Sequence, residues 1–318
     1  MNRTIKFIIN PSEITAGTRG SSLGPFALLT AARKRGRFLF SENDLVCIKD
    51  CNQLLDKETN YPLAKNIDGL VTVFETISEE IQHTVKENNF PVILAADHGS
   101  AGGTIAGLRA AYPGKRLGVI WIDAHGDLHS PYTTPSGNMH GMPLSTALNE
   151  DNLPCRKNEV DEETKEMWEH LKNLHGIAPK INPQDLIFVG VRDTEEEENA
   201  LIERLNIRNF TVKEVKERGA RKIAGEIVEK LNACDVIYLS FDVDSMDPDI
   251  TSHGTGTPVP GGLHNEEARE LILELLKSEK IICLEVVEVN PCLDEKINKM
   301  AEITFDILNE CVQQLKQS

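Results

Sequence analysis

The sequence lacks several features that would place it in a special class of protein. No apolar run approaches the ~18 residues that a membrane-spanning helix needs. The first six residues lack the apolar stretch of a signal peptide. No segment rich in proline, glycine and serine divides the chain. We therefore expect a cytoplasmic protein that has no membrane partner and whose residues 1–318 form a single domain.

Positive charge is also scarce. The chain has 34 Lys and Arg against 50 Asp and Glu, so its net charge is −16. The densest basic stretch, residues 33–37, is short. A chain this acidic is a poor candidate for binding nucleic acid or an anionic membrane surface. We expect no nucleic-acid partner.

Cysteine pairs with metal-ligand spacing are missing as well. The seven cysteines are odd in number and include no CxxC pair. Cys234 and Cys283 lie in or beside apolar runs, where in a reducing compartment they act as small buried hydrophobic residues. The chemistry of the chain must be sought in other side chains.

What the sequence does contain is a series of continuous apolar runs, separated by segments with helical spacing. The predicted strands cover residues 5–9, 45–48, 92–95, 117–122, 186–191, 236–241 and 281–289. The predicted helices cover residues 70–85, 196–205, 223–231, 266–276 and 297–315. Continuous rather than alternating runs are typical of parallel strands buried on both faces, and their alternation with helices predicts an α/β fold. We interpret the acidic runs at 161–163 and 195–198 as solvated helix surface.

Aspartates and histidines follow three of these strands, at the point where each strand ends. They are His98, Asp123, His125, Asp127, Asp242 and Asp244. Functional groups of parallel sheets lie in loops at the carboxyl ends of strands, so we expect these six side chains to meet. Within the second and third groups the spacing is two residues. In an extended segment that spacing places side chains on one side.

The charge of this group predicts a site for two metal ions. Four crowded carboxylates repel one another and raise one another's pKa, and two divalent cations neutralise them. Six side chains bridging two ions are typical of hydrolytic two-metal centres. Oxygen-rich ligands with two imidazoles and no thiolate suit Mn²⁺, with Co²⁺, Fe²⁺ or Ni²⁺ as alternatives. A single Asp at a strand end is more often a capping residue, but three such groups after three strands favour a metal centre.

These motifs resemble those of ureohydrolases of the arginase/agmatinase group, most closely arginases. The similarity covers nearly the whole chain, and its motifs are Asp-His after a strand, DAHGD at 123–127, SFDVDSMDP at 240–248, GTGTPVPGGL at 254–263 and EVNP at 288–291. It implies a three-layer α/β/α fold with a mainly parallel eight-stranded sheet. It also implies two Mn²⁺ ions per subunit and hydrolysis of a guanidinium group to release urea.

The resemblance further implies a role for each metal ligand. It assigns the first ion to His98, Asp123, Asp127 and Asp242. It assigns the second ion to Asp123, His125, Asp242 and Asp244, so that Asp123 and Asp242 bridge. Two such ions can lower the pKa of a bridging water enough to give hydroxide at neutral pH, and this metal-bridging hydroxide would attack the guanidinium carbon.

Catalytic roles also come from the resemblance. It assigns to Glu288 a bidentate grip on the guanidinium, to His140 the movement of protons, and to Asp127 a place among the catalytic residues. Thr257 matches a threonine near the guanidinium. From the sequence alone, the alternative for His140 is a structural loop histidine, which is the less favoured interpretation, whereas a threonine before proline, like Thr257, is more often a turn residue.

The loop at residues 128–138 is arginase-like and predicts L-arginine as the small-molecule guanidino substrate, with L-ornithine and urea as products. In arginases, residues matching Ser136 and Asn138 hydrogen-bond the α-carboxylate, and an acidic residue matching Glu195 faces the α-amino group. Because agmatine has no carboxylate, Ser136 and Asn138 weigh against it.

The chain also departs from the family pattern. His129 stands where arginases usually have an Asn that addresses the α-carboxylate, and Glu195 stands where Asp is common. Ala95 and Ala96 replace two glycines, and Gly99 replaces a serine. Because alanine is a poor host for a positive φ, we expect this strand end to be repacked.

Two other interpretations stay open. The chain could be another ureohydrolase of the agmatinase, guanidinobutyrase or formimidoylglutamase type, or an inactive metal-binding relative with a structural role. The filled ligand positions, with His140 and Glu288, favour an enzyme. The resemblance also implies assembly into homo-trimers or homo-hexamers.

Overall fold

The computed structural model describes residues 3–296 and 298–317 of the chain. Residues 1–2, which belong to the segment read for a signal peptide, and residue 297, the expected start of the last helix, lie outside the described residues. Within the described part, eight strands form one parallel sheet in the order β2-β1-β3-β8-β7-β4-β5-β6. The strands are β1 (Thr4–Asn10), β2 (Asp44–Cys47), β3 (Asn89–Ala95), β4 (Leu117–Ile122), β5 (Leu186–Val189), β6 (Arg208–Phe210), β7 (Val236–Asp242) and β8 (Ile281–Val287).

Seven of these strands coincide with the predicted apolar runs. All six residues of β4 and all seven of β7 are buried, as continuous apolar runs in a sheet covered on both faces require. The eighth strand, β6, is implied by the family resemblance but matches none of the predicted apolar runs. It has only three residues, of which Arg208 and Asn209 are polar, so it carries no apolar run.

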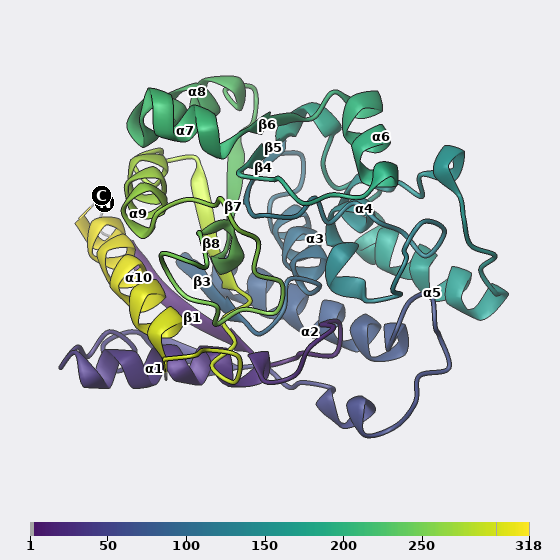
Figure 1. Ribbon diagram of the computed structural model, residues 1–318, viewed down its shortest axis with the longest axis horizontal. Helices are drawn as coiled ribbons and strands as arrows, with labels where there is room; N and C mark the ends of the chain where they lie inside the picture. The colour runs from purple at the N-terminus through teal and green to yellow at the C-terminus, as the bar shows by residue number, and fades with distance from the viewer. Residues whose placement is uncertain (1–2, 297, 318) are drawn as a thin grey trace.

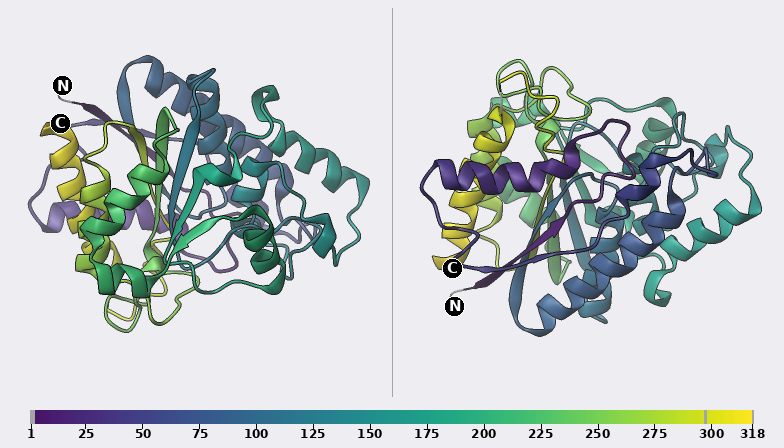
Figure 2. Two further views of the ribbon diagram at one scale, coloured as in Figure 1. Left: turned by 90° about the horizontal axis from the view of Figure 1, so that it is seen from above. Right: turned by 90° about the horizontal axis from the view of Figure 1, so that it is seen from below.

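Helices cover both faces of the sheet, which confirms the three-layer α/β/α expectation (Figures 1 and 2). One layer consists of α1 (Gly24–Lys34), α7 (Val212–Arg218), α8 (Ala220–Lys230), α9 (Asn265–Leu275) and α10 (Lys299–Gln317). The other consists of α2 (Ile67–Lys86), α3 (Ala101–Ala111), α4 (Pro143–Leu148), α5 (Glu162–Lys172) and α6 (Glu196–Leu205). The short 3₁₀ helices are η1 (Ser21–Leu23), η2 (Asn52–Asp56), η3 (Met139–Gly141), η4 (Leu153–Cys155), η5 (Leu174–Gly176), η6 (Pro183–Asp185) and η7 (Val243–Ser245).

Helix α2 illustrates how the outer layers attach. Leu70 and Ile77 lie on its buried face, as the helical spacing predicts. Helix α3 packs closely along α2 because it presents glycines: a Cβ at Gly103 would lie 2.8 Å from Cα of Phe74, and one at Gly107 would lie 2.8 Å from Cα of Ser78. Across residues 3–296 and 298–317, the helices are all too short or too polar to cross a bilayer.

The strand order places the predicted ligands together. Strands β3, β8, β7 and β4 are consecutive neighbours at the centre of the sheet. Because all of them are parallel, their carboxyl ends share one edge, and the loops that follow them meet there. His98, Glu288 and Asp123 follow β3, β8 and β4, and Asp242 is the last residue of β7.

Candidate metal centre and active site

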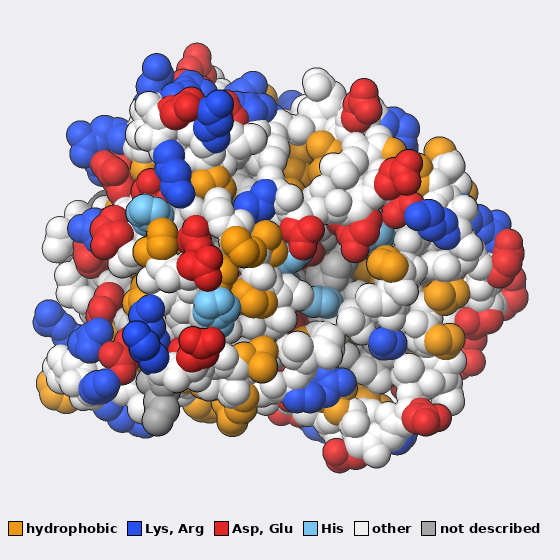
Figure 3. Space-filling view, viewed as in Figure 1, with side chains coloured by type: hydrophobic (Ala, Val, Ile, Leu, Met, Phe, Trp, Pro, Cys, Tyr) orange, Lys and Arg blue, Asp and Glu red, His pale blue; other side chains and the backbone are white. Residues whose placement is uncertain are grey.

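A pocket of about 230 Å³ opens at this edge of the sheet. Histidine and acidic side chains gather around a hollow on this face of the molecule (Figure 3). The lining includes four histidines and seven carboxylates but no lysine or arginine. Every predicted site residue except Asp123 lines the pocket; Asp123 is fully buried.

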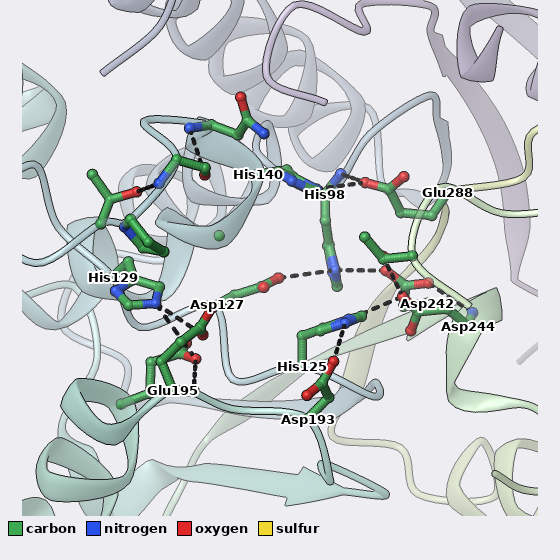
Figure 4. Close-up of a pocket in the computed structure, with 17 residues that line it drawn as sticks. His98, His125, Asp127, His129, His140, Asp193, Glu195, Asp242, Asp244 and Glu288 are labelled. Atoms are coloured by element: carbon green, nitrogen blue, oxygen red, sulfur yellow. Dashed lines mark hydrogen bonds and ion pairs between the residues drawn. The ribbon is translucent and has the colours of Figure 1, made fainter. Parts of the chain in front are cut away.

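Three aspartates surround His98. Its Nδ1 lies 2.9 Å from Oδ2 of Asp123. It also lies 3.1 Å from Oδ2 of Asp242 and 3.3 Å from Oδ2 of Asp127 (Figure 4). The structure thus brings together all four residues that the resemblance assigns to the first ion.

A second group forms around His125. Its Nδ1 lies 3.0 Å from Oδ2 of Asp244 and 3.5 Å from Oδ1 of Asp123. Asp123 therefore turns one carboxylate oxygen toward His98 and the other toward His125. The second oxygen of Asp242, the other expected bridge, accepts a hydrogen bond from the backbone N–H of Asp244 at 2.8 Å.

The ligands converge by turns, and not along the extended segments that we expected. The backbone bends after β4, where the N–H of His125 donates to Oδ1 of Asp123 at 2.7 Å, and Asp127 has a left-handed φ of 50°. After β7 the chain enters η7, which contains Asp244. Aspartate side chains that accept hydrogen bonds from nearby backbone N–H groups favour such turns over an extended strand. The expectation that residues two positions apart point to the same side, which holds for an extended segment, therefore fails here.

The donors of this centre fit divalent cations. Nδ1 of His98 and Oδ2 of Asp123 are buried and have no hydrogen bond of acceptable geometry, although they lie 2.9 Å apart. Buried polar atoms without partners are costly, and a metal ion would satisfy both. Imidazole nitrogens and carboxylate oxygens without thiolates suit Mn²⁺ and its neighbours.

The ring of His98 is held on both sides. It stacks on the indole of Trp121 with a centroid separation of 3.8 Å and an interplanar angle of 2°, and its Nε2 shares a hydrogen bond of 2.7 Å with Oγ of Ser240. Such contacts fix the orientation of a metal-binding imidazole. Burial opposes a charge on His98, but its attraction to Asp123, 2.9 Å away, and to Asp127 outweighs burial and raises the pKa to about 9 in the metal-free protein.

Glu288, His140 and Thr257 lie on one side of the metal centre. Oε1 of Glu288 accepts the backbone N–H of His98 at 2.9 Å and lies 3.6 Å from Nδ1 of His140. Glu288 has a φ of 68°, in the left-handed region that residues other than Gly, Asn and Asp rarely adopt. The hydroxyl of Thr257 donates to Oδ2 of Asp244 at 3.0 Å, so this threonine also orients a predicted ligand.

Ser136 and Asn138 line the outer part of the pocket. The backbone N–H of Asn138 donates to Oγ of Ser136 at 3.1 Å, which leaves the serine O–H free to donate. The Nζ of Lys65 donates to Oδ1 of Asn138 at 3.1 Å, so the amide nitrogen faces the other way. Sequence reasoning missed Lys65, and no motif marks it.

His129 points toward the start of α6. Its Nε2 lies 3.0 Å from Oε2 of Glu195 (Figure 4) and 3.7 Å from Oε2 of Glu198. Its Nδ1 shares a hydrogen bond of 3.1 Å with Oγ1 of Thr133. The hydrogen bond with His129 lowers the pKa of Glu195 to about 2, and burial raises the pKa of Glu198 to about 7. The side chain of Glu195 is half exposed.

The interpretation of residues 195–198 as solvated surface is wrong for two of the four. Glu197 and Glu198 are buried, and Glu198 is only 3% exposed. One oxygen of Glu198 accepts the backbone N–H of Leu128, and the other accepts that of Glu195 at the start of α6. Glu195 and Glu198 line the pocket because α6 begins beside it, so that part of this acidic run faces inward.

The departures near His98 do not strain the backbone. Neither Ala95 nor Ala96 has a positive φ. A Cβ at Gly99 would lie 2.3 Å from Oγ1 of Thr15, so the loop after β3 needs glycine there to let Thr15 approach. The close contact therefore falls at Gly99, and the two alanines are accommodated without special geometry.

Two residues of the Gly190–Asp193 segment also serve the site. Oδ2 of Asp193 lies 3.8 Å from Nε2 of His125. The Arg192 guanidinium donates to the backbone carbonyls of Asp244 at 3.0 Å and of Val259. It thereby ties the metal-binding turn to the loop that carries Thr257.

Comparison with known proteins gives consistent matches. A model described as the Arginase family matches residues 3–313. An arginase of Bacillus subtilis (strain 168) is 34% identical over 311 residues, covering 97% of each chain. The structure of Bacillus caldovelox arginase matches with a TM-score of 0.81 and 31% identity over 98% of each chain. The structure of Entamoeba histolytica arginase in complex with L-ornithine matches with a TM-score of 0.80 and 29% identity over 99% of each chain.

Proposed function

We propose that this chain, which belongs to the arginase family of hydrolases, converts L-arginine to L-ornithine and urea with two Mn²⁺ ions. The observation that carries the proposal is the composition of the pocket. Its inner end is a set of histidines and aspartates suited to divalent cations, and its outer end holds Ser136 and Asn138 as hydrogen-bond donors. A substrate with a guanidinium at one end and a carboxylate at the other matches both ends.

Six residues would hold the two ions. They are His98, Asp123, His125, Asp127, Asp242 and Asp244. When bound, the ions would supply the positive charge that makes water a nucleophile near neutral pH, with Co²⁺, Fe²⁺ or Ni²⁺ as possible occupants. Asp123, which faces both histidines, supports a shared centre over two separate sites.

Glu288 would orient the guanidinium. One of its oxygens is fixed by the backbone N–H of His98, and it is buried beside the metal-binding residues. A fixed carboxylate can accept two N–H groups of a planar guanidinium and hold its carbon in place. Thr257, whose O–H is committed to Asp244, can still accept a hydrogen bond through its lone pairs.

His140 and Asp127 would handle protons. Hydrolysis breaks the bond between the guanidinium carbon and the chain nitrogen, and this nitrogen must gain a proton as it leaves. The imidazole of His140 lies beside Glu288, where the guanidinium would be held, and lines the pocket. Asp127 lines the pocket on the side of His98. Positioned groups of this kind contribute roughly 10²–10⁴ to a rate.

The outer end of the pocket supports an amino-acid substrate. Ser136 and Asn138 can donate to an α-carboxylate, and Glu195 can accept from an α-ammonium group. Agmatine lacks the carboxylate and would leave these donors unpaired, at about 1–3 kcal/mol for each buried group.

A urea-release assay tests the proposal. Purified protein loaded with Mn²⁺ is offered L-arginine, agmatine and 4-guanidinobutyrate in parallel. We expect urea from L-arginine, with a kcat/KM at least tenfold above that for the other two. Equal or better turnover of agmatine would assign the chain to another ureohydrolase class. No urea from any of the three would support either an inactive relative or an enzyme of the formimidoylglutamase type, whose substrate carries no guanidinium group.

Assembly and location belong to the same proposal. We propose a homo-trimer or homo-hexamer in the cytoplasm, as the family resemblance implies. The seven cysteines are all free, as in a reducing compartment. Light scattering at micromolar concentration would give the number of subunits.

A further inference from the structure

A third group of potential metal ligands lies beside the two-metal centre, and it consists of His129, Glu195 and Glu198. One ligand atom from each of the three lies within 4.8 Å of the others. The group faces the same pocket, on the side away from Glu288 (Figure 4). In the described part of the chain, only the sets around His98 and His125 share this arrangement.

The three groups are alike in geometry. In each, an imidazole nitrogen points at carboxylate oxygens: 2.9 Å for His98 and Asp123, 3.0 Å for His125 and Asp244, and 3.0 Å for His129 and Glu195. One imidazole and two carboxylates can be the complete protein ligand set of a divalent ion, whose charge they neutralise. An ion pair alone needs only one carboxylate.

Two of the three ligands are already held in place. Nδ1 of His129 is engaged with Oγ1 of Thr133, which leaves Nε2 for an ion. Glu198 is buried and anchored by the backbone N–H groups of Leu128 and Glu195. Only Glu195, which is half exposed, is free to adjust. A preorganised pair with one movable ligand keeps the cost of binding low.

The charge of the pocket also favours another cation. Seven carboxylates line it, and buried Asp123 makes eight. Two divalent ions neutralise four of these charges, and no lysine or arginine lines the wall. A substrate with one net positive charge leaves negative charge in excess at the end where His129 lies.

We propose that His129, Glu195 and Glu198 form a third divalent-cation site, which Zn²⁺ can occupy, at the wall of the pocket. One imidazole nitrogen with carboxylate oxygens and an open position is a ligand set that Zn²⁺ accepts. An ion there occupies Glu195. If the proposed function is right, it therefore competes with the α-ammonium group of L-arginine and acts as an inhibitor.

Metal stoichiometry tests the site without any substrate. Mn²⁺-loaded protein is equilibrated with excess Zn²⁺, freed of unbound ions and measured by elemental analysis. We expect three metal ions per chain in the wild type and two in His129→Asn and in Glu195→Gln. The matched control is His170→Asn, which removes a surface His–Glu pair (His170 with Glu75, 3.1 Å) that has no third ligand, and it should keep three ions.

Two ions per wild-type chain at saturating Zn²⁺ would mean that His129 and Glu195 form an ion pair only, and would overturn the proposal. Three ions in both variants would place the extra ion elsewhere and overturn it too.

Kinetics test the inhibitory role separately. Zn²⁺ added to the Mn²⁺ enzyme should raise KM for L-arginine at least tenfold and leave kcat unchanged. KM for 4-guanidinobutyrate, which has no amino group, should not rise; an equal rise for both substrates would refute the competition with the ammonium group.

Discussion

His140 lies where a single side chain can separate metal binding from turnover. Its Nδ1 is 3.6 Å from Glu288, and the three aspartates around His98 do not contact it in any described pair. We expect His140→Ala to keep both Mn²⁺ ions and to lower kcat by roughly 10²–10⁴, the usual size of general acid–base catalysis. Elemental analysis and steady-state urea release on the same sample measure both quantities. Unchanged kcat with full metal content would make His140 a structural residue.

Lys65 is the cation that holds Asn138. Its Nζ donates to Oδ1 of Asn138, and its own backbone N–H donates to the carbonyl of Gly137. We expect Lys65→Met to free the Asn138 amide and to raise KM for L-arginine about tenfold, because the amide N–H groups are no longer aimed. KM for agmatine, which has no carboxylate, should change little.

The conservative variant Lys65→Arg is the control for this prediction. Its guanidinium can still donate to Oδ1 of Asn138, so KM for L-arginine should stay within about threefold of the wild type. Equal losses for L-arginine and agmatine in Lys65→Met would indicate a general collapse of the loop.

For single residues, the sequence predicts which side chains belong to the site better than it predicts which residues contact them. Motif spacing was enough to find the ligands, because strand ends in a parallel sheet meet at one edge. It could not find Lys65, because Lys65 and Asn138 are 73 positions apart and neither residue type is unusual. The left-handed φ angles of Asp127 and Glu288 could not be predicted either, because the residue types Asp and Glu do not by themselves indicate a positive φ.

Strand β8 carries a carboxyl group into the centre of the sheet. Glu285 is fully buried, and its Oε2 accepts the hydroxyl of Tyr238 on the neighbouring strand β7 at 2.7 Å. Its Oε1 has no hydrogen-bond partner. Burial raises the pKa of Glu285, while the hydrogen bond from Tyr238 reduces the shift.

This shift predicts how stability depends on pH. Between the unfolded pKa, near 4.5, and the higher folded pKa, the folded chain binds more protons at Glu285, so stability falls as pH rises. Glu285→Gln cannot ionise. We therefore expect its free energy of unfolding, relative to the wild type, to increase between pH 5 and pH 8. Each unit of pKa difference corresponds to about 1.4 kcal/mol.

Urea denaturation of both metal-free proteins at pH 5 and pH 8 measures the difference. Parallel behaviour of the two proteins across this range would contradict the prediction and indicate that Glu285 is ionised in the fold. Comparing the two proteins at each pH removes the contributions of all other titrating groups.

Elements were predictable where a long apolar pattern sets them. Strand β4 and helix α6 match their expected bounds because each has a continuous or periodic apolar pattern. Strand β6 has three residues and depends on its neighbour β5 for pairing, so its sequence alone gives no signal. At the acidic start of α6 the sequence carries a signal, but the prediction from it was wrong. A run of charged residues predicts a solvent-exposed surface, whereas Glu198 is buried because the start of α6 lies beside the pocket.

For the whole molecule, the carboxylates of the proposed metal centre repel one another when no ion is bound and stabilise the fold when ions bind them. Eight carboxylates gather at one edge of the sheet in a protein that already carries a net charge of −16. Ions that bind only the folded chain stabilise it by about 2.7 kcal/mol per site at a hundredfold excess over Kd. We expect chelation to abolish urea release and to lower Tm by roughly 5 °C or more, with Mn²⁺ reversing both effects.

Differential scanning fluorimetry with an external dye, with chelator and with added Mn²⁺, measures this shift. Asp242→Ala removes a carboxylate that faces His98, so its Tm should respond much less to Mn²⁺. Identical melting of the wild type with and without metal would argue against ions at this centre.

The stacking of His98 on Trp121 gives the protein an optical probe of its own. The chain has two tryptophans, and the second, Trp168, packs in a different cluster and donates its indole N–H to Asp151. Because its pKa is raised to about 9, we expect the imidazole of His98 to carry a proton at neutral pH in the metal-free protein, and an imidazolium stacked on an indole is expected to quench its emission. An ion that takes the place of this proton changes the emission of Trp121 and leaves that of Trp168 alone. Intrinsic fluorescence should therefore follow the filling of the first metal position in real time, and Trp121→Phe should remove the signal.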